Sequence, residues 1–153
     1  MKNVVVAYDG DGNTFEVATE RLIFRPSVYG VLRKDNEILV QRNPLLSGFN
    51  LPGGGIELGE DEKTALKREF LEETGLMIQV GEILDAKTDY YTYGGQFYHC
   101  VMVFYFVEEV SGSLLTESNG DDSEEALFYP IDKLLEGEIQ RVFHSVVKKL
   151  QKV

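Results

Sequence analysis

The sequence has little cysteine, no tryptophan and no long apolar segment. Cys100 is the sole cysteine among 153 residues. A lone cysteine cannot form an internal disulfide, which excludes a small secreted scaffold held together by disulfides. The longest apolar run, Cys100–Val107, is far shorter than the ~18 residues that a membrane-spanning helix needs. We therefore interpret this run as a buried strand.

Basic residues are also scarce, and this limits the partners that the chain can have. The sequence contains 15 Lys and Arg against 26 Asp and Glu, for a formal net charge of −11. Nucleic acids and anionic membranes recruit basic patches, so this charge argues against both as docking surfaces. The Met1-Lys2 start lacks the apolar core of a signal peptide. We expect a cytoplasmic protein.

The length and the hydrophobic content predict one folded unit. With 43% hydrophobic residues, a chain of this size can bury one core, so we expect a single domain over residues 1–153. Near its start, β-branched runs flank an Asp- and Gly-rich turn, which predicts a β-hairpin at 3–18. The turn resembles part of a calcium-binding EF-hand loop, but Thr14 stands where that motif needs glycine. A plain turn is therefore favoured.

A glycine-rich loop leads into an acidic helix within Leu51–Leu76, which reads LPGGGIELGEDEKTALKREFLEETGL. The glycines suit a backbone that needs positive φ or the close approach of a ligand. Asp61 places negative charge in the first turn and Gly75 suits the position after the last turn, so we predict a helix between them. Leu66 and Phe70 fall on one edge and should fasten this helix to a sheet.

Three glutamates of this helix fall on one neighbouring arc. Glu69, Glu72 and Glu73 are close enough to repel one another, which costs an isolated helix a few tenths of a kcal/mol per pair. A hard divalent cation such as Mg²⁺ or Mn²⁺ would compensate, because it selects oxygen ligands. The glycine turn could add a carbonyl, and Arg68 could orient Glu69. The alternative is a solvated acidic face on a surface helix.

Between Gly54 and Leu76, particular residue types stand at the fixed spacing of a known family signature. The fixed positions are Gly54, Glu60, Arg68-Glu69-Phe70, Glu72-Glu73 and Gly75-Leu76. This pattern resembles the Nudix box, the signature of the Nudix hydrolases. Phe70 stands where that family more often has an aliphatic residue, which affects packing beneath the helix rather than chemistry. The resemblance implies an α/β fold, an α/β/α sandwich with a mixed β-sheet between helices.

The resemblance also implies an activity, the metal-dependent hydrolysis of a diphosphate linkage in a nucleoside diphosphate derivative. Candidate substrates are nucleoside triphosphates and dinucleoside polyphosphates, with Mg²⁺ or Mn²⁺ as the cofactor. We expect Glu69, Glu72 and Glu73 to bind the metal together with the carbonyl of Gly53. Glu69 is also a candidate general base, Glu72 a candidate catalytic residue, and Arg68 the orienting cation.

Two other functions remain open for a chain with this signature. A nucleotide-sensing module can keep the Nudix fold without cleaving its ligand, although such a module would be expected to lose carboxylates of the box. An isomerase acting on a diphosphate substrate shares the fold, but no residue suited to protonating an alkene stands out. The partner expected is a small-molecule nucleotide, and a homodimer is left open.

Three residues outside the box are candidates for substrate binding. Arg42 ends a predicted strand, and in Nudix-like domains an arginine near this point often faces the substrate phosphates; a surface ion pair is the alternative. Tyr91 and Tyr93 lie in a predicted turn-prone loop and could stack a nucleobase, although cross-strand packing explains them equally well. A carboxylate of the acidic loop Thr116–Glu125 could complete the metal site.

The remaining elements complete the predicted sandwich. Met77–Thr88 is expected to be a strand kinked at Gly81, and Gln96–Glu109 a long strand at the centre of the sheet, because both of its faces are apolar. From Glu138 onward, apolar residues recur at helical spacing, which predicts an amphipathic terminal helix packed on the core.

Overall fold

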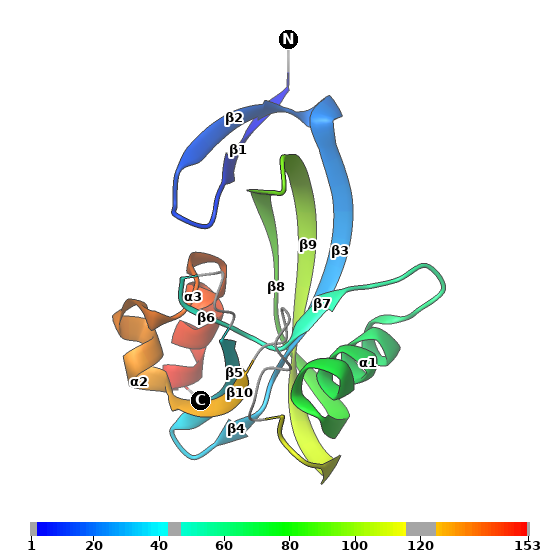
Figure 1. The fold of residues 1–153 in the computed structure, drawn as a ribbon, viewed down its shortest axis with the longest axis vertical. Helices are drawn as coiled ribbons and strands as arrows, with labels where there is room; N and C mark the ends of the chain where they lie inside the picture. Colours follow the sequence, from blue (N-terminus) through cyan, green and yellow to red (C-terminus); the bar gives the residue numbers. More distant parts are fainter. Residues whose placement is uncertain (1–2, 43–46, 116–124, 153) are drawn as a thin grey trace.

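The computed structural model describes residues 3–42, 47–115 and 125–152, and their strands form two sheets with helices on either side (Figure 1). The strand order is β2-β1-β8-β9-β3-β7 in the first sheet and β10-β5-β4 in the second, where β6 also pairs with β5. The strands of the first sheet are β1 (Val4–Tyr8), β2 (Thr14–Ala18), β3 (Leu22–Val31), β7 (Gly53–Gly55), β8 (Leu76–Tyr93) and β9 (Gln96–Gly112). Those of the second are β4 (Arg33–Lys34), β5 (Glu37–Arg42), β6 (Phe49–Asn50) and β10 (Glu125–Pro130).

The α/β fold with a mixed sheet between helices is confirmed. The long strand β9 lies at the centre of the first sheet, as its two apolar faces predict, and it pairs parallel with β3 and antiparallel with β8. The division into two sheets was not anticipated. It arises because β5 takes β10, β4 and β6 as its neighbours, so its ladder is separate from that of β3 and β9.

Helix α1 (Glu62–Thr74) covers one side of the sheets, and its limits follow from local signals. The Asp61 side chain accepts a hydrogen bond of 2.7 Å from the backbone N–H of Thr64, so Asp61 is the N-cap. Gly75 ends the helix with φ of 79°, a left-handed conformation that favours glycine. Leu66 and Phe70 are fully buried under the helix, which confirms that they fasten it to the sheet.

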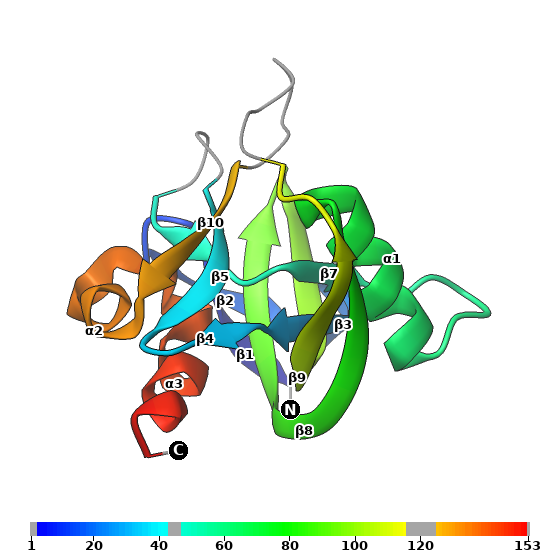
Figure 2. The ribbon, with the colours of Figure 1, turned by 90° about the horizontal axis from the view of Figure 1, so that it is seen from below.

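The other helices lie on the opposite side of the molecule from α1 (Figure 2). These helical elements are α2 (Ile131–Lys133), η2 (Leu134–Glu138), α3 (Arg141–Lys149) and η3 (Leu150–Lys152), and a short η1 (Thr19–Arg21) precedes β3. The terminal amphipathic helix is confirmed, with Phe143, Val146 and Val147 buried in the core. It begins at Arg141 rather than Glu138, because Ile139 and Gln140 have extended backbone, with ψ of 146° and 145°. No helix in the described ranges is long and apolar enough to span a membrane.

Strands β1 and β2 form an antiparallel hairpin at the edge of the first sheet, which curves over the turn between β8 and β9 (Figure 1). In its turn the Asp9 carboxylate accepts hydrogen bonds from the backbone N–H groups of Asp11 and Asn13, at 2.9 and 2.8 Å, and from Asn13 Nδ2 at 3.0 Å. These bonds show that Asp9 stabilises the turn. Tyr8 at the end of β1 pairs in parallel with Tyr91 of β8, which joins the hairpin to the sheet.

The tyrosine-rich segment near residue 91 is strand, so the prediction of a loop there is wrong. Strand β8 continues through Tyr93, and only Gly94 and Gly95, with φ of 60° and 77°, form the turn into β9. The ring of Tyr91 stacks on that of Tyr98 across the two strands, with centroids 5.1 Å apart. Cross-strand aromatic packing therefore extends β8 beyond the point where composition alone suggested a turn.

Candidate active site

A cavity of about 570 Å³ lies where the hairpin, the first sheet, the end of α1 and the start of α3 meet. Its lining includes Tyr8 from the hairpin, Gly53 and Gly54 from β7, Glu73 from α1 and Arg141 from α3. Of the glutamates expected to bind a metal, Glu73 alone lines it. The Nudix-box residues thus stand at one end of a space large enough for a small molecule.

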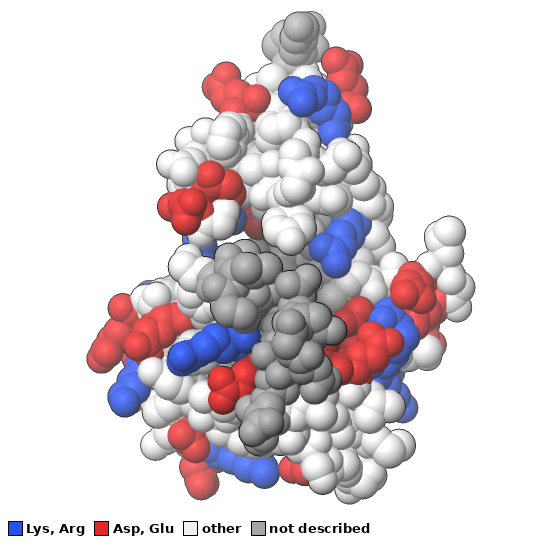
Figure 3. Space-filling model, viewed as in Figure 1, with Lys and Arg blue, Asp and Glu red and all other residues white. Residues whose placement is uncertain are grey.

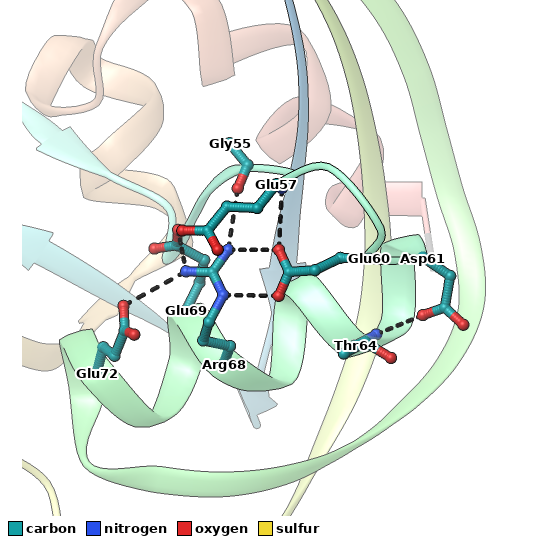
Figure 4. A network of polar contacts seen from close by, with 8 residues as sticks. All are labelled: Gly55, Glu57, Glu60, Asp61, Thr64, Arg68, Glu69 and Glu72. Carbon is teal, nitrogen blue, oxygen red and sulfur yellow. Dashed lines mark hydrogen bonds and ion pairs between the residues drawn. The ribbon is translucent and has the colours of Figure 1, made fainter.

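Arg68 is the centre of a hydrogen-bond network on α1 (Figure 4). Its Nε and Nη2 atoms each donate to a carboxylate oxygen of Glu60 at 2.8 Å. Nη1 donates to Glu69 at 3.0 Å and approaches Glu72 at 3.5 Å, and Nη2 donates to the Gly55 carbonyl at 3.2 Å. One guanidinium therefore ties the loop, the helix and the glycine strand together. In the orientation of Figure 3, acidic and basic side chains gather over α1.

The environment of Glu60 keeps that carboxyl ionised. Its hydrogen bonds with Arg68, and then that from the backbone N–H of Glu57, lower the pKa of Glu60 to about 2. The same pairing raises the pKa of Arg68. Arg68 is therefore a fixed positive charge, and Glu60 holds it in place from the loop.

The glycine strand β7 is in close contact with two of the expected ligands. The backbone N–H of Gly53 donates to Glu73 Oε2 at 3.0 Å. A Cβ atom placed on Gly54 would lie 2.8 Å from the carboxylate carbon of Glu69. At Gly53 such an atom would lie 2.1 Å from the carbonyl oxygen of Val28, and φ is +149°. Glycine is thus required by the backbone at Gly53, whereas at Gly54 it leaves room for the present position of the Glu69 carboxylate.

The three glutamates do not form a ready set of metal ligands. Over residues 3–42, 47–115 and 125–152, no group of three or more His, Cys, Asp or Glu side chains is arranged to hold an ion. Instead Glu69 and Glu72 accept from Arg68, and Glu73 accepts from Gly53. The donor set nevertheless fits a hard divalent cation, because all of it is carboxylate oxygen placed beside the carbonyls of a glycine strand.

Arg25 of β3 faces the same cavity, a position that no local signal in the sequence marks. Its Nη1 atom donates to the hydroxyl of Tyr91 at 2.6 Å, and its Nε would lie 3.2 Å from a Cβ on Gly55. Burial raises the pKa of Tyr91, so the hydroxyl is neutral, and Arg25 has no ion pair with a carboxylate of the described ranges. Arg25 therefore places a positive charge beside the glycine strand.

The residues predicted to bind substrate are separated in the structure. Tyr91 and Tyr93 line the cavity, and Tyr93 is 67% exposed. Arg42 is not among the lining residues; its guanidinium lies 4.8 Å over the ring of Phe49. A role for Arg42 at the substrate remains a prediction that this arrangement does not favour. Of the acidic loop, Glu125 begins β10 and is exposed, and residues 116–124 lie outside the described ranges.

A second arginine closes the far side of the cavity. Arg141 Nη2 lies 3.0 Å from both carboxylate oxygens of Asp89, and the Arg141 guanidinium lies 3.9 Å over the ring of Tyr8. This cluster joins α3, β8 and the hairpin. No local sequence signal marks this cluster, because Arg141 is 52 residues from Asp89 and Tyr8 is 81 residues from Asp89, so the three meet only through tertiary packing.

Comparisons with known proteins agree with this geometry. The family model for the NUDIX domain matches residues 23–149. An ADP-ribose pyrophosphatase of Methanocaldococcus jannaschii is 35% identical over 121 residues, which cover 74% of this chain and 68% of that protein. An RNA pyrophosphohydrolase of Dinoroseobacter shibae is 44% identical over 48 residues, but these cover only 31% of this chain and 30% of that protein.

Solved structures show the same fold at lower sequence identity. A MutT NUDIX hydrolase from Burkholderia pseudomallei has a TM-score of 0.68 at 21% identity and covers 84% of this chain and 98% of that one. A MutT protein from Bacillus halodurans also has a TM-score of 0.68, at 20% identity, and covers 81% and 80% of the two chains. Since the family model spans most of its length and the signature on α1 is complete, this chain belongs to the Nudix family of pyrophosphohydrolases, enzymes that act on acid anhydrides.

Proposed function

We propose that the protein hydrolyses a diphosphate linkage in a nucleoside diphosphate derivative, with Mg²⁺ or Mn²⁺ as cofactor. The observation that carries this proposal is the placement of Glu69 and Glu73 against consecutive glycines of β7; both glycines and Glu73 line a cavity large enough for a nucleotide. Carboxylates close to glycine backbone give the oxygen-rich surroundings that a divalent cation and phosphate oxygens share.

Each residue of this cluster has a proposed role. Glu69, Glu72 and Glu73 would hold the cation together with the Gly53 carbonyl, and a cation held there would lower the pKa of a water and offset charge on the phosphate. Glu69 is also the candidate base for that water. Arg68 positions Glu69 through the 3.0 Å hydrogen bond from Nη1.

Arg25 is proposed to bind the substrate phosphates. A guanidinium whose described partner is a neutral hydroxyl keeps its charge for an incoming anion. Its position near Gly55 places it beside the proposed metal ligands, where the diphosphate has to lie. In a chain of net charge −11, such a local positive charge is needed to draw a polyanion into the cavity.

Purified protein should be incubated with Mg²⁺ and a panel of ADP-ribose, nucleoside triphosphates, dinucleoside polyphosphates and RNA with a 5′-triphosphate. ADP-ribose is the first compound to test, because the Methanocaldococcus jannaschii relative is named an ADP-ribose pyrophosphatase. The expected products are a nucleoside monophosphate and the remaining phosphorylated group, with no release when EDTA replaces Mg²⁺. Binding of a nucleotide without any product would instead identify a sensing module.

A further inference from the structure

Two amide side chains in the cavity have buried polar atoms without a hydrogen-bond partner. They are Nε2 of Gln41, at the end of β5, and Oδ1 of Asn50, in β6. Neither atom has a partner within residues 3–42, 47–115 and 125–152. Both residues line the cavity, and Gln41 is only 1% exposed. Buried polar groups are almost always hydrogen-bonded in native proteins, so a pair of exceptions in one cavity calls for an explanation.

The two amides are direct neighbours in the sheet. Gln41 and Asn50 are paired in the antiparallel ladder of β5 and β6, so their side chains stand on the same face. On its other flank Gln41 is paired with Ala126, which has no polar side-chain atom. A donor and an acceptor thus lie side by side without forming a hydrogen bond to each other. Both are available to a ligand that can accept from one and donate to the other.

The chemistry of these atoms limits what that group can be. Nε2 of Gln41 is a donor, and Oδ1 of Asn50 is an acceptor. A fully ionised phosphate can accept from the first but has no proton to give to the second. The edge of a nucleobase carries an acceptor beside an N–H donor in one plane, and side-chain amides read nucleobase edges in this way elsewhere. The terminal torsions of Gln and Asn are broad, so both atoms can turn toward an entering ligand.

We propose that Gln41 and Asn50 form the subsite that recognises the nucleobase of the substrate. This inference rests on the proposed function, since it assigns one part of the same nucleotide to one part of the same cavity. Asn50 is three residues before Gly53, so the amide pair adjoins the glycine strand where the diphosphate is expected. The unpaired atoms carry a cost in the free protein that binding of the base removes.

The test is direct binding measured by isothermal titration calorimetry in the presence of Mg²⁺. The probes are AMP, GMP, CMP and UMP, each compared with ribose 5-phosphate, which has the same sugar phosphate but no base. The variants are Gln41→Met and Asn50→Leu, which keep the side-chain size and remove the amide. Leu39→Met, on the same strand and fully buried outside the cavity lining, is the matched control.

In the wild type we expect at least one monophosphate to bind more tightly than ribose 5-phosphate. Each amide variant should lower the affinity for that monophosphate by roughly 3- to 10-fold, which corresponds to the loss of one hydrogen bond. The affinity for ribose 5-phosphate should not change. Leu39→Met should retain the wild-type preference. The melting temperature of Gln41→Met should equal or exceed that of the wild type, because the substitution removes an unpaired donor.

Three results would overturn the proposal. Unchanged monophosphate affinity in both amide variants would mean that the nucleobase does not bind to Gln41 Nε2 or Asn50 Oδ1. An equal loss of affinity for ribose 5-phosphate in the amide variants would mean that Gln41 and Asn50 bind a sugar hydroxyl instead of the base. A lower melting temperature for Gln41→Met than for Leu39→Met would give the amide a structural role. Failure of the proposed function is distinct, because it appears as the absence of hydrolysis of the whole nucleotide panel in the wild type.

Discussion

Arg68 holds Glu60 through two hydrogen bonds of 2.8 Å, one from Nε and one from Nη2, across eight residues of sequence. Both groups are largely shielded, with 24% and 15% of their side chains exposed. The geometry is the paired one in which a guanidinium meets both oxygens of a carboxylate, so it fixes direction as well as distance. It leaves Nη1 of Arg68 for Glu69. Glu60 therefore acts on the candidate active site through Arg68.

The first prediction concerns acid stability. The pKa of Glu60 falls from 4.5 to about 2 in the folded protein, so its pairing with Arg68 stabilises the fold above pH 4.5. This contribution is lost as the pH falls through about 2, where the folded protein also takes up the proton. Glu60→Gln should therefore melt at a lower temperature than the wild type at pH 6, and the difference should shrink steadily toward pH 2.

Melting curves at closely spaced pH values measure this difference. The control is Glu16→Gln, which removes an exposed carboxylate of β2 that has no ion pair within the described part of the chain. Its melting temperature should follow the wild type throughout. A Glu60→Gln difference that stayed constant from pH 6 to pH 2 would show that the effect is not ionic.

Two adjacent glycines should respond in opposite ways to the same added methyl group. Gly53→Ala forces a Cβ to within 2.1 Å of the Val28 carbonyl oxygen at φ of +149°, so it should cost more than about 2 kcal/mol of stability. Gly54→Ala instead meets the end of the Glu69 side chain at 2.8 Å, which can move. Gly54→Ala should keep most of its stability and lose most of its activity.

Urea denaturation and turnover of the best substrate check this pair. Each variant serves as the control for the other, because the change in mass and chemistry is identical. Equal losses of stability in the two variants would mean that the Glu69 side chain cannot move away from the added Cβ. Both glycines would then be needed for the fold.

Local signals in the sequence were enough to predict α1, but not the cavity it faces. Asp61 and Gly75 mark the helix ends whatever surrounds them, and the spacing of Leu66 and Phe70 gives the buried face. Hydrogen bonds within a few residues determine these features. The start of the terminal helix could not be predicted in this way, since Ile139 fits the apolar period of the helix but has an extended backbone.

Arg25 shows why the rest could not be read from the sequence. It faces the site because β3 pairs with β9, and β9 pairs with β8, which brings Tyr91 within 2.6 Å although it is 66 residues away. The pairing of distant strands is a tertiary property with no local signature. Arg42 looked the better candidate because it precedes the box, yet its side chain lies over Phe49.

A third prediction follows from the contact between Arg25 and Tyr91. Arg25→Gln removes the positive charge and should raise KM for an anionic nucleotide about 10-fold or more. Tyr91→Phe keeps the charge but removes the acceptor that holds it at 2.6 Å, so its effect on KM should be smaller. Steady-state kinetics at several salt concentrations measure both variants.

The salt dependence separates a charge effect from a change in packing. Screening weakens an interaction between Arg25 and a phosphate, so KM of the wild type should rise with salt, while that of Arg25→Gln should rise less. Arg21→Gln, on η1 near the hairpin, serves as a charge-matched control because Arg21 lies over Phe97 and does not line the cavity. Equal salt dependence in wild type and Arg25→Gln would contradict phosphate binding by Arg25.

The last prediction concerns Glu73, whose Oε2 accepts from the Gly53 N–H at 3.0 Å. Glu73→Gln removes the negative charge, but its amide oxygen can still accept that hydrogen bond. We therefore expect activity to fall at least about 100-fold while the melting temperature changes little, because a neutral amide is a far weaker ligand for a hard cation. Glu108→Gln, an exposed carboxylate of β9, controls for the loss of one charge and should remain active. Near-normal turnover of Glu73→Gln would refute Glu73 as a metal ligand, and unfolding of this variant would show that its charge is needed for the fold.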